Sequence, residues 1–230
     1  FQLMAADYSQ IELRIIAALS GDTNMIQAFN SGIDIHTATA AKVYKISPEE
    51  VTKDQRSSAK AVNFGIIYGQ SAFGLAQNLN IKRGEAKEMI ENYFAQYPTV
   101  KSYMDECVAN ARENGYVETI MKRRRYLKDI NSANAMVRGF AERNAVNAPI
   151  QGSAADVIKL AMIGVFGAMQ EKNTKSKMLL QVHDELVFDV HESEIEMMKE
   201  LVKHEMESAV EIAVPLDVEI EVADNWLEAH

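Results

Sequence analysis

The chain has 230 residues, of which 47% are hydrophobic and 25% are charged, and its formal net charge is −9. This composition is ordinary for a soluble globular protein, and the length suffices for one sizeable core or for a core with an appended helical lobe. The single cysteine, Cys107, excludes an internal disulfide and suits a reducing cytosol. No apolar stretch is expected to approach the roughly 20 residues that a membrane span needs.

The start of the chain and its charge pattern add two expectations. Phe1 already lies in a strand-like run and no initiator methionine precedes it, so we expect a piece of a longer protein. The negative net charge argues mildly against nucleic-acid binding, which needs clustered Lys and Arg. However, much of the acid lies in 191–229, whereas Lys122-Arg123-Arg124-Arg125 is a basic run. A protein that collects metal ions can be acidic overall and basic along one groove.

The first half of the chain is predicted to be mainly helical after an initial strand over 1–6. Asp22 and Asp34 are suitable helix caps, and Gly69 and Gly115 are suitable ends. Apolar spacing and these signals predict helices over 11–20, 22–30, 34–44, from Ser47-Pro48 onward, over 53–68 and over 83–114, the last interrupted near Pro98.

The second half begins with an irregular or hairpin-like stretch over 116–130 and ends in strands. Its predicted elements are helices over 135–148 and 153–170 separated by Pro149 and Gly152, a hairpin over 177–190 that turns near His183-Asp184, a helix over 195–210 and a strand over 215–222. Few strands at both ends with helices between them indicate an α+β fold. We expect one small antiparallel sheet, backed by the helices over 11–20, 153–170 and 195–210, that brings Asp7 beside Asp184.

Asp7 and the pair Asp184-Glu185 each lie where a strand-like run ends. Two-metal phosphoryl transfer uses carboxylates that bridge two divalent ions. Magnesium prefers oxygen ligands and keeps several waters, so two or three carboxylates and substrate phosphates suffice for it. The alternative is that each aspartate is an ordinary turn residue. The sequence alone leaves the two interpretations at even odds.

The helix over 53–68 carries cationic and aromatic residues at four-residue spacing, which forms one gently winding stripe: Arg56, Lys60, Phe64 and Tyr68. Such a stripe can hold a triphosphate and stack on its sugar or base. Alternatively, it is a solvated basic face with aromatic core residues. The other side of the helix is apolar and is expected to pack inward through Ala59, Val62 and Ile66. Gly65 and Gly69 are expected to serve packing or capping, since phosphate-loop spacing is absent.

Four segments together resemble the motifs of family A DNA polymerases, the bacterial DNA polymerase I type. They are Asp7 to Arg14, Arg56 to Gly69, Asn147 to Asp156 and Val182 to Glu185, in that order along the chain. The resemblance implies a palm from 1–20 and 151–230, with fingers over 21–150. The basic loop 116–130 and the helix after it then lie at the palm border. Family members carry a thumb and the first palm strands ahead of the first motif, and both are missing from this sequence.

The resemblance also implies roles at the reacting centre. Two Mg²⁺ ions would be held by Asp7, Asp184 and the backbone carbonyl of Tyr8, with Glu185 as a nearby helper. The incoming deoxynucleoside triphosphate would be contacted by Gln10, His36, Arg56, Lys60, Phe64 and Tyr68. Within this set Lys60 would also protonate the pyrophosphate, Phe64 would pack on the sugar, and Tyr68 would lie by the templating base. On its own, His36 is more typical of a surface helix histidine.

Glu12 resembles the steric gate of the family, a side chain that fills the space of a ribose 2′-hydroxyl. A clash or an unpaired buried group makes such exclusion strong. Glu12→Ala is therefore expected to relax discrimination against ribonucleotides in the complete enzyme, which a competition assay measures. Glu12 also suits the first turn of a helix, where the dipole favours an acid.

Several further residues resemble contacts with primer–template DNA. Arg143, Asn147 and Gln151 would reach the minor groove, where acceptors on every base pair permit a check of shape without sequence, and His183 would lie by the primer terminus. Without the family, the first three are equally well explained as polar caps near Pro149. Arg123 and Arg124 would contact the DNA backbone, although Lys122 stands where the family has glycine and Lys128 where proline is common. A charge run is more often a solvated face.

The function expected from the sequence is template-directed DNA synthesis in replication and repair, by a monomer in the bacterial cytosol or nucleoid that acts on DNA and dNTPs and not on membranes. The catalytic residues would be Asp7, Asp184, Glu185 and Lys60. The alternative is a fragment that binds nucleotide and DNA but extends primers poorly or not at all, because the thumb and the first palm strands are missing. A metal-dependent nuclease is a third candidate, which the triphosphate-binding stripe disfavours.

Overall fold

The computed structural model describes residues 1–229 and has an α+β fold, as predicted. The chain forms two compact units. Unit 1 combines residues 1–12 with the chain from Ala154 onward, and unit 2 comprises Leu13–Ser153. His230 lies outside the described residues. Each unit contains one half of the predicted chemistry, so the two are described separately.

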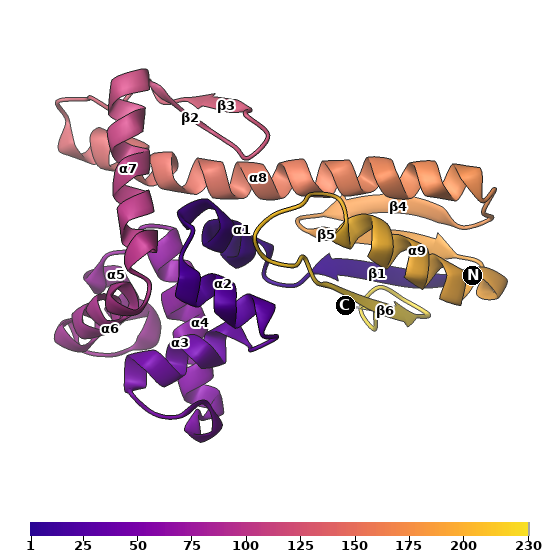
Figure 1. Ribbon diagram of the computed structural model, residues 1–230, viewed down its shortest axis with the longest axis horizontal. Coiled ribbons are helices and arrows are strands. Elements are labelled where there is room, and N and C mark those ends of the chain that lie inside the picture. The colour runs from indigo at the N-terminus through magenta and orange to yellow at the C-terminus, as the bar shows by residue number, and fades with distance from the viewer. Residues whose placement is uncertain (230) are drawn as a thin grey trace. The chain divides into compact units, whose positions relative to one another are not determined.

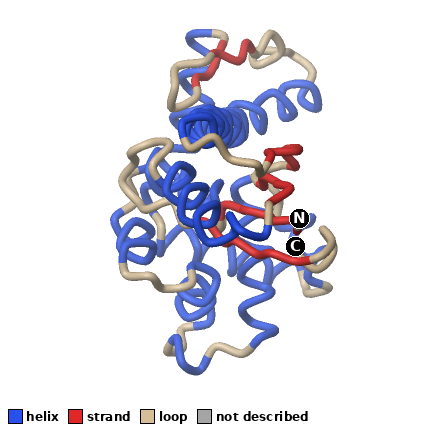
Figure 2. The backbone as a smooth tube through the Cα atoms, turned by 90° about the vertical axis from the view of Figure 1, so that its right-hand side faces the viewer, coloured by secondary structure: helices blue, strands red, loops and turns tan. Residues whose placement is uncertain are grey.

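Unit 1 is built on a four-stranded antiparallel sheet in the order β4-β5-β1-β6, whose strands lie side by side (Figure 1, Figure 2). The bounds are β1 Gln2–Tyr8, β4 Lys177–Val182, β5 Glu185–Val190 and β6 Val218–Ala223. The predicted strands and hairpin are confirmed, although β6 begins three residues later than expected. β4 and β5 are joined by His183 and Asp184 alone, since Val182 pairs with Glu185. The first and last segments of the chain therefore share one sheet.

One face of this sheet is a fully buried core. Met4, Ala6 and Tyr8 alternate along β1, and the first two lie opposite Phe188 and Leu186 on β5. The helix α9 (Ile195–Glu207), which follows the short 3₁₀ helix η2 (Glu192–Glu194), contributes buried apolar residues of its own. It is tied to β1 by the Tyr8 hydroxyl, which donates to the carbonyl of Met206 at 2.6 Å. Alternation in the strands and helical spacing in α9 thus fix the register that positions Asp7.

The helix α8 (Ala135–Glu171) is continuous, which corrects the expectation of two helices separated by Pro149 and Gly152. A proline inside a helix costs ~3 kcal/mol or more, because it lacks an N–H and its ring crowds the preceding turn. Here the helical turn after Pro149 is stabilised by hydrogen bonds of Ser153, one of which comes from a residue outside the helix. The buried Ser153 hydroxyl donates to the Pro149 carbonyl at 2.5 Å and accepts the N–H of Ile120 at 2.9 Å. Burial of Ala148 and Ile150 also favours the helical path.

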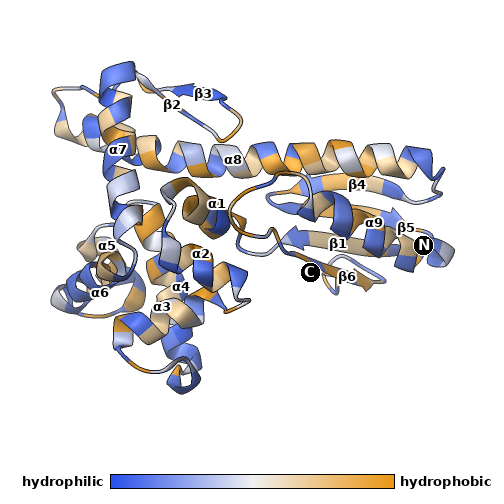
Figure 3. Cartoon of the chain, viewed as in Figure 1, coloured by the Kyte–Doolittle hydropathy of each residue, from blue (hydrophilic) through white to orange (hydrophobic). Residues whose placement is uncertain are grey.

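The expectation that no stretch is long and apolar enough to span a membrane is wrong for α8. By length and composition alone this helix passes that test, and Figure 3 shows the apolar residues that recur along it. The core helix of a soluble protein passes the same test, so the finding is weak evidence. The expected absence of membrane binding stays a prediction.

Unit 2 is mainly helical and carries one short hairpin. In chain order its elements are α1 Ile11–Ser20 (which begins in unit 1), α2 Thr23–Asn30, α3 Ile35–Tyr44, the 3₁₀ helix η1 Pro48–Glu50, α4 Lys53–Ile67, α5 Ala72–Leu79, α6 Arg83–Gln96, α7 Pro98–Asn114, β2 Tyr116–Glu118, β3 Arg124–Tyr126 and the first half of α8. The predicted caps Asp22 and Asp34 are confirmed, and Pro98 and Gly115 start and end α7 as expected. The helix α5 was not predicted, although Ser71 caps it by accepting the N–H of Gly74.

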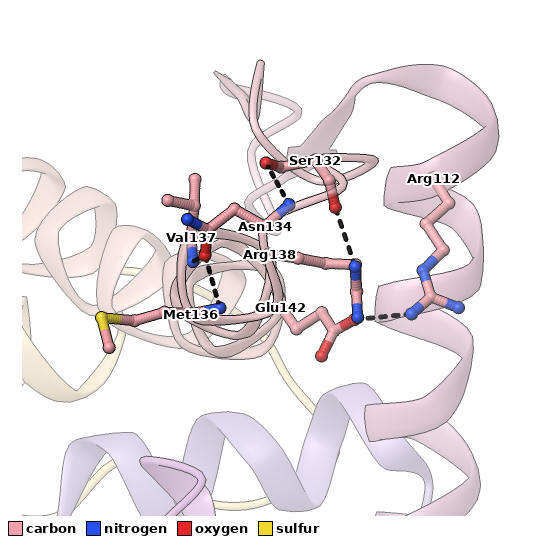
Figure 4. A network of polar contacts seen from close by, with 7 residues as sticks. All are labelled: Arg112, Ser132, Asn134, Met136, Val137, Arg138 and Glu142. Carbon is pink, nitrogen blue, oxygen red and sulfur yellow. Dashed lines mark hydrogen bonds and ion pairs between the residues drawn. The ribbon is translucent and has the colours of Figure 1, made fainter.

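A polar network fixes the start of α8 against α7 (Figure 4). Glu142 on α8 accepts a hydrogen bond from Arg112 on α7 at 2.6 Å and lies 3.7 Å from the guanidinium of Arg138. Arg138 also donates to the carbonyl of Ser132 at 2.8 Å, and Asn134 accepts the N–H of Met136 at 2.9 Å at the helix start. Arg143, which follows Glu142 directly, is therefore carried on an anchored segment.

Candidate functional site

The carboxylates of unit 1 are brought together by backbone pairing. Asp7 at the end of β1 pairs with Glu185 at the start of β5, and directly opposite residues project from the same face of an antiparallel sheet. The backbone N–H of Tyr8 donates to the carbonyl of Asp184 at 3.3 Å. The two predicted acidic segments are thus hydrogen-bonded neighbours, with Asp184 in the turn that precedes Glu185.

These carboxylates are partly shielded from solvent. Burial, and secondarily the charge of Glu185, raises the pKa of the half-buried Asp184. Glu185 is 3% exposed and accepts a hydrogen bond from the Trp226 indole at 2.9 Å. No group of three or more His, Cys, Asp or Glu within 1–229 forms a ready metal cage. A cation here would therefore need oxygen ligands from elsewhere, such as phosphates.

Other predicted residues of unit 1 lie on the turns next to these strand ends. Gln10 adopts a left-handed backbone conformation (φ 56°) between β1 and α1, and Glu12 lies in the first turn of α1. His183 is also left-handed (φ 54°), exposed, and directly precedes Asp184 in the two-residue turn. The backbone carbonyl of Tyr8, predicted as a metal ligand, lies at the end of β1 beside Asp7.

In unit 2 the predicted stripe lies along α4 and opens on a cleft. The helix begins with a capping box between Thr52 and Gln55, and its apolar residues Ala59, Val62 and Ile66 are buried as predicted. Lys60, Phe64 and Tyr68 line a cleft of about 830 Å³ together with residues of α5 and with Arg143. The rings of Phe64 and Tyr68 are stacked, with centroids 6.4 Å apart. The cleft thus combines cations with an aromatic wall.

Arg56, one turn before Lys60, is held by Asp34. Its Nε and Nη2 donate to the two carboxylate oxygens of Asp34 at 2.9 and 2.8 Å, while Asp34 also caps α3 through the N–H of Thr37 at 2.7 Å. Partial burial raises the pKa of Asp34, but the bonds from Arg56 and Thr37 outweigh it and hold that pKa well below its usual range. The guanidinium therefore has a fixed orientation. Its third nitrogen, Nη1, does not take part in the bonds to Asp34.

His36 is buried rather than exposed, so the interpretation as a surface helix histidine is wrong. Its ring lies 5.9 Å from that of Phe64, and its Nδ1 lies 2.9 Å from the amide nitrogen of Asn63. Burial is the main reason that the pKa of His36 falls from 6.5 to about 4, with Arg56 and Lys60 lowering it further and Asp34 opposing them. His36 is consequently neutral at physiological pH.

The predicted DNA contacts of α8 lie at four-residue spacing: Arg143, Asn147 and Gln151. Arg143 packs across the end of α4, where a Cβ added to Gly69 would lie 3.1 Å from its Cγ. Gly69 itself has φ 70°, which favours glycine. The Oδ1 of Asn147 is buried without a hydrogen-bond partner, and Gln151 is exposed. The row of predicted DNA contacts thus begins with Arg143 at the cleft and continues along α8.

The basic hairpin β2–β3 is docked on α8. Arg123 donates to the carbonyl of Gly152 at 2.9 Å, and Gly152 permits the approach, because an added Cβ would lie 2.6 Å from Thr119. Arg124 donates to Glu118 at 2.9 Å and lies 4.3 Å above the ring of Tyr116. Lys122 has a left-handed backbone (φ 63°), the conformation for which glycine is best suited. The structure thus explains why a family would have glycine at this position.

Sequence reasoning missed two residues that support the site. Asp34 was predicted only as a cap, since its bond to Arg56 joins positions 22 residues apart. Asn63 was not considered, although a signal existed: it is a polar residue on the apolar side of α4, next to Val62. A buried polar side chain needs a partner, and this one joins His36.

Comparison with known proteins identifies the family. The family model of DNA polymerase family A matches residues 1–228. The chain belongs to this family. Curated relatives named DNA polymerase I from Lactococcus lactis subsp. cremoris (strain MG1363) and Geobacillus stearothermophilus are each 54% identical, over 228 and 227 residues. Each alignment covers 99% of this chain and 26% of the relative, so the chain spans about a quarter of the length of these family members.

A solved structure of the same family agrees over the whole chain. It is described as the POL domain of Pol1 from M. smegmatis in complex with DNA primer-template and dNTP. Its sequence is 47% identical, its TM-score is 0.96, and the match covers 100% of this chain and 40% of that one. The family expected from the four sequence motifs and the α+β fold expected from the order of the predicted strands and helices are thereby confirmed.

Proposed function

We propose that the chain belongs to an enzyme of template-directed DNA synthesis, in which a primer 3′-hydroxyl attacks the α-phosphate of a deoxynucleoside triphosphate and pyrophosphate leaves. Family membership supports this proposal, as does the M. smegmatis relative whose structure contains primer-template and dNTP. The observation that carries it is the cleft on α4, where Lys60, Phe64 and Tyr68 combine a cation with stacked aromatic rings.

Unit 1 is the proposed palm, and its carboxylates are the proposed metal ligands. Asp7, Asp184 and the carbonyl of Tyr8 offer the oxygen donors that Mg²⁺ prefers, and a nearby cation would favour the ionised form of Asp184 against its burial. Bound as a pair, Mg²⁺ ions supply neutralisation of the charge that develops on the phosphate oxygens. Glu185, which accepts a hydrogen bond from Trp226, is the proposed helper beside Asp184.

Unit 2 is the proposed fingers, and α4 binds the triphosphate. Arg56 and Lys60 lie one turn apart and match adjacent phosphates, while Phe64 packs on the sugar. Lys60 is the proposed proton donor to pyrophosphate, and Tyr68 the residue beside the templating base. Positioning and charge neutralisation supply most of the rate in phosphoryl transfer.

Contacts with the primer–template are proposed for residues of α8, the basic hairpin and the β4–β5 turn. On α8, Arg143, Asn147 and Gln151 would follow the minor groove, where their side-chain N–H groups can donate to the acceptors that every base pair presents. Arg123 and Arg124 would contact the DNA backbone, and His183 the primer terminus.

A second candidate function rests on the length of the chain. Because the chain spans only 26% of its relatives, the 230 residues alone are expected to bind nucleotide and DNA but to extend primers poorly or not at all. Efficient extension by the purified chain would contradict this second proposal and leave the first intact.

The decisive experiment measures nucleotide binding, which does not depend on primer extension. Lys60→Ala is compared with Lys87→Ala, a matched control on α6 whose ammonium pairs with Glu91. We expect dNTP–Mg²⁺ affinity to fall at least about tenfold in Lys60→Ala only, as for loss of a charge-assisted contact of ~1.5–3 kcal/mol. Absence of dNTP binding by the unaltered chain, together with strand degradation in Mg²⁺, would instead indicate a nuclease.

A further inference from the structure

A chain of hydrogen bonds runs through the interior of unit 2 and ends at His36. The hydroxyl of Tyr97 lies 3.3 Å from that of Thr39, and Thr39 donates to the Oδ1 of Asn63 at 3.0 Å. The amide nitrogen of Asn63 lies 2.9 Å from the Nδ1 of His36. All four residues are buried, with at most 2% of their surface exposed. This series of hydrogen bonds joins α3, α4 and the junction between α6 and α7.

The direction of these bonds fixes which nitrogen of His36 carries the proton. Thr39 has one hydroxyl proton, which it gives to Asn63, so Tyr97 must donate to Thr39. With its Oδ1 used as the acceptor, Asn63 presents its NH₂ group to His36, and an NH₂ group can only donate. The Nδ1 of His36 is therefore the acceptor, and the proton of the neutral ring lies on Nε2. Within residues 1–229, Nε2 has no hydrogen-bond partner.

We propose that Asn63 is a positioning residue that holds His36 as a neutral Nε2–H donor for a phosphate oxygen of the incoming nucleotide. The proposal rests on the proposed function, because it needs a triphosphate beside α4. Thr39 and Tyr97 act one step further back: Tyr97 donates to Thr39, and Thr39 gives its single proton to the Oδ1 of Asn63, which leaves the NH₂ group of Asn63 for His36. A turned amide would present its oxygen to Nδ1, move the proton there and leave Nε2 as an acceptor that repels phosphate.

The charged groups that face His36 explain why a neutral donor is suitable. Asp34 lies two residues before it on the same helix end, whereas Arg56 and Lys60 face it from α4. These two cations already supply the positive charge for the phosphates, and a third would be repelled by them. The pKa of His36 near 4 agrees with this balance, because burial and the two cations outweigh Asp34. The hydrogen bond from His36 is thus independent of pH over the physiological range.

The tautomer is measured directly in the 230-residue chain with ¹⁵N-labelled histidine. We expect His36 to show a proton-bearing Nε2 and an unprotonated Nδ1 from pH 5.5 to 8. In Asn63→Asp, the new carboxylate accepts from Nδ1–H, and the pKa of His36 rises by about one unit or more. His183, which is exposed, and His191, which is half-buried, are internal controls whose signals stay unchanged. A proton on Nδ1 in the unaltered chain would overturn the proposal without any variant having to fold.

A binding measurement then separates this proposal from the proposed function. We expect dNTP–Mg²⁺ affinity of the unaltered chain to be flat between pH 5.5 and 8, and affinity of Asn63→Asp to fall at least about fivefold above pH 7. Thr39→Val is the milder variant, with a smaller loss in the same direction. Nucleotide binding that stays equal in all three proteins would refute the role of Asn63 alone. An unaltered chain that binds no nucleotide would refute the function, while the tautomer result would still stand.

Discussion

The two halves of the proposed site are held by different kinds of bond. In unit 1, strand pairing places Asp7 opposite Glu185, so the backbone sets the positions of the acids. In unit 2, side chains from other helices set the chemistry of α4, because Asp34 orients Arg56 and Asn63 holds His36. Acids fixed by the backbone should be replaceable without harm to the fold. Where a side chain orients a cation or a hydrogen-bond donor, replacement of that side chain should change the orientation or the protonation of the group it holds.

The largest expected effect comes from the acids. Asp184→Asn should lower the rate of nucleotide addition by at least about 100-fold in a primer-extending form of the protein, since a group that holds charge at the reacting centre is removed. The same change should leave the melting temperature of the chain equal or higher. Burial raises the pKa of Asp184, so the ionised carboxylate opposes folding at neutral pH and the amide does not.

The matched control for Asp184→Asn is Asp189→Asn, which lies on β5, the strand that follows Asp184, opposite Leu3 at the far end of β1. Extension should be nearly normal in this control. A loss of several degrees in Asp184→Asn would show that the acid is part of what holds the sheet, and would break the contrast between the two units.

The second effect concerns pH and His36. Its pKa is 6.5 ordinarily and about 4 in the fold, so the unfolded chain binds a proton that the folded chain does not between these values. The contribution of His36 to the free energy of unfolding is therefore fully present above about pH 6.5 and is lost as pH falls toward 4. At ~1.4 kcal/mol per pKa unit, the loss amounts to ~3 kcal/mol. Urea unfolding of the chain at pH 7 and pH 4.5 measures it. His36→Gln should lose most of this slope, and an unchanged slope would show that other groups cause it.

The same contrast explains what could be predicted from the sequence. Strand alternation and helix caps are local signals, so the sheet that joins Asp7 to Asp184 and the start of α4 followed from the residues themselves. The continuity of α8 through Pro149 could not be predicted, because Ser153 and Gly152 are held there by a hairpin some 30 residues earlier in the chain. The partners of Arg56 and His36 are likewise side-chain contacts between helices, for which periodicity carries no information.

The third effect is on the ion pair behind Arg56. Asp34→Asn keeps a cap for α3 but removes the charge, and we expect a loss of about 1 kcal/mol or less, because both side chains are partly exposed and water screens the pair. Nucleotide affinity should fall several-fold, since the guanidinium loses its fixed orientation. Asp22→Asn is the control, as Asp22 caps α2 without an ion pair to Arg56. Equal nucleotide affinity in both variants would show that Asp34 serves only as a cap.

The smallest effect is at Lys122 in the basic hairpin, where backbone strain and charge can be separated. Its left-handed conformation (φ 63°) costs a non-glycine residue ~1 kcal/mol, so Lys122→Gly should stabilise the chain by about that amount in urea unfolding. Lys122→Ala removes the same charge but keeps the strained backbone. If the hairpin contacts the DNA backbone, both variants should weaken DNA binding alike and lower its salt dependence by about one phosphate contact. Unchanged DNA binding in both, with stability gained only in Lys122→Gly, would show that this lysine faces solvent and that its turn is shaped by the docking of Arg123 on α8 alone.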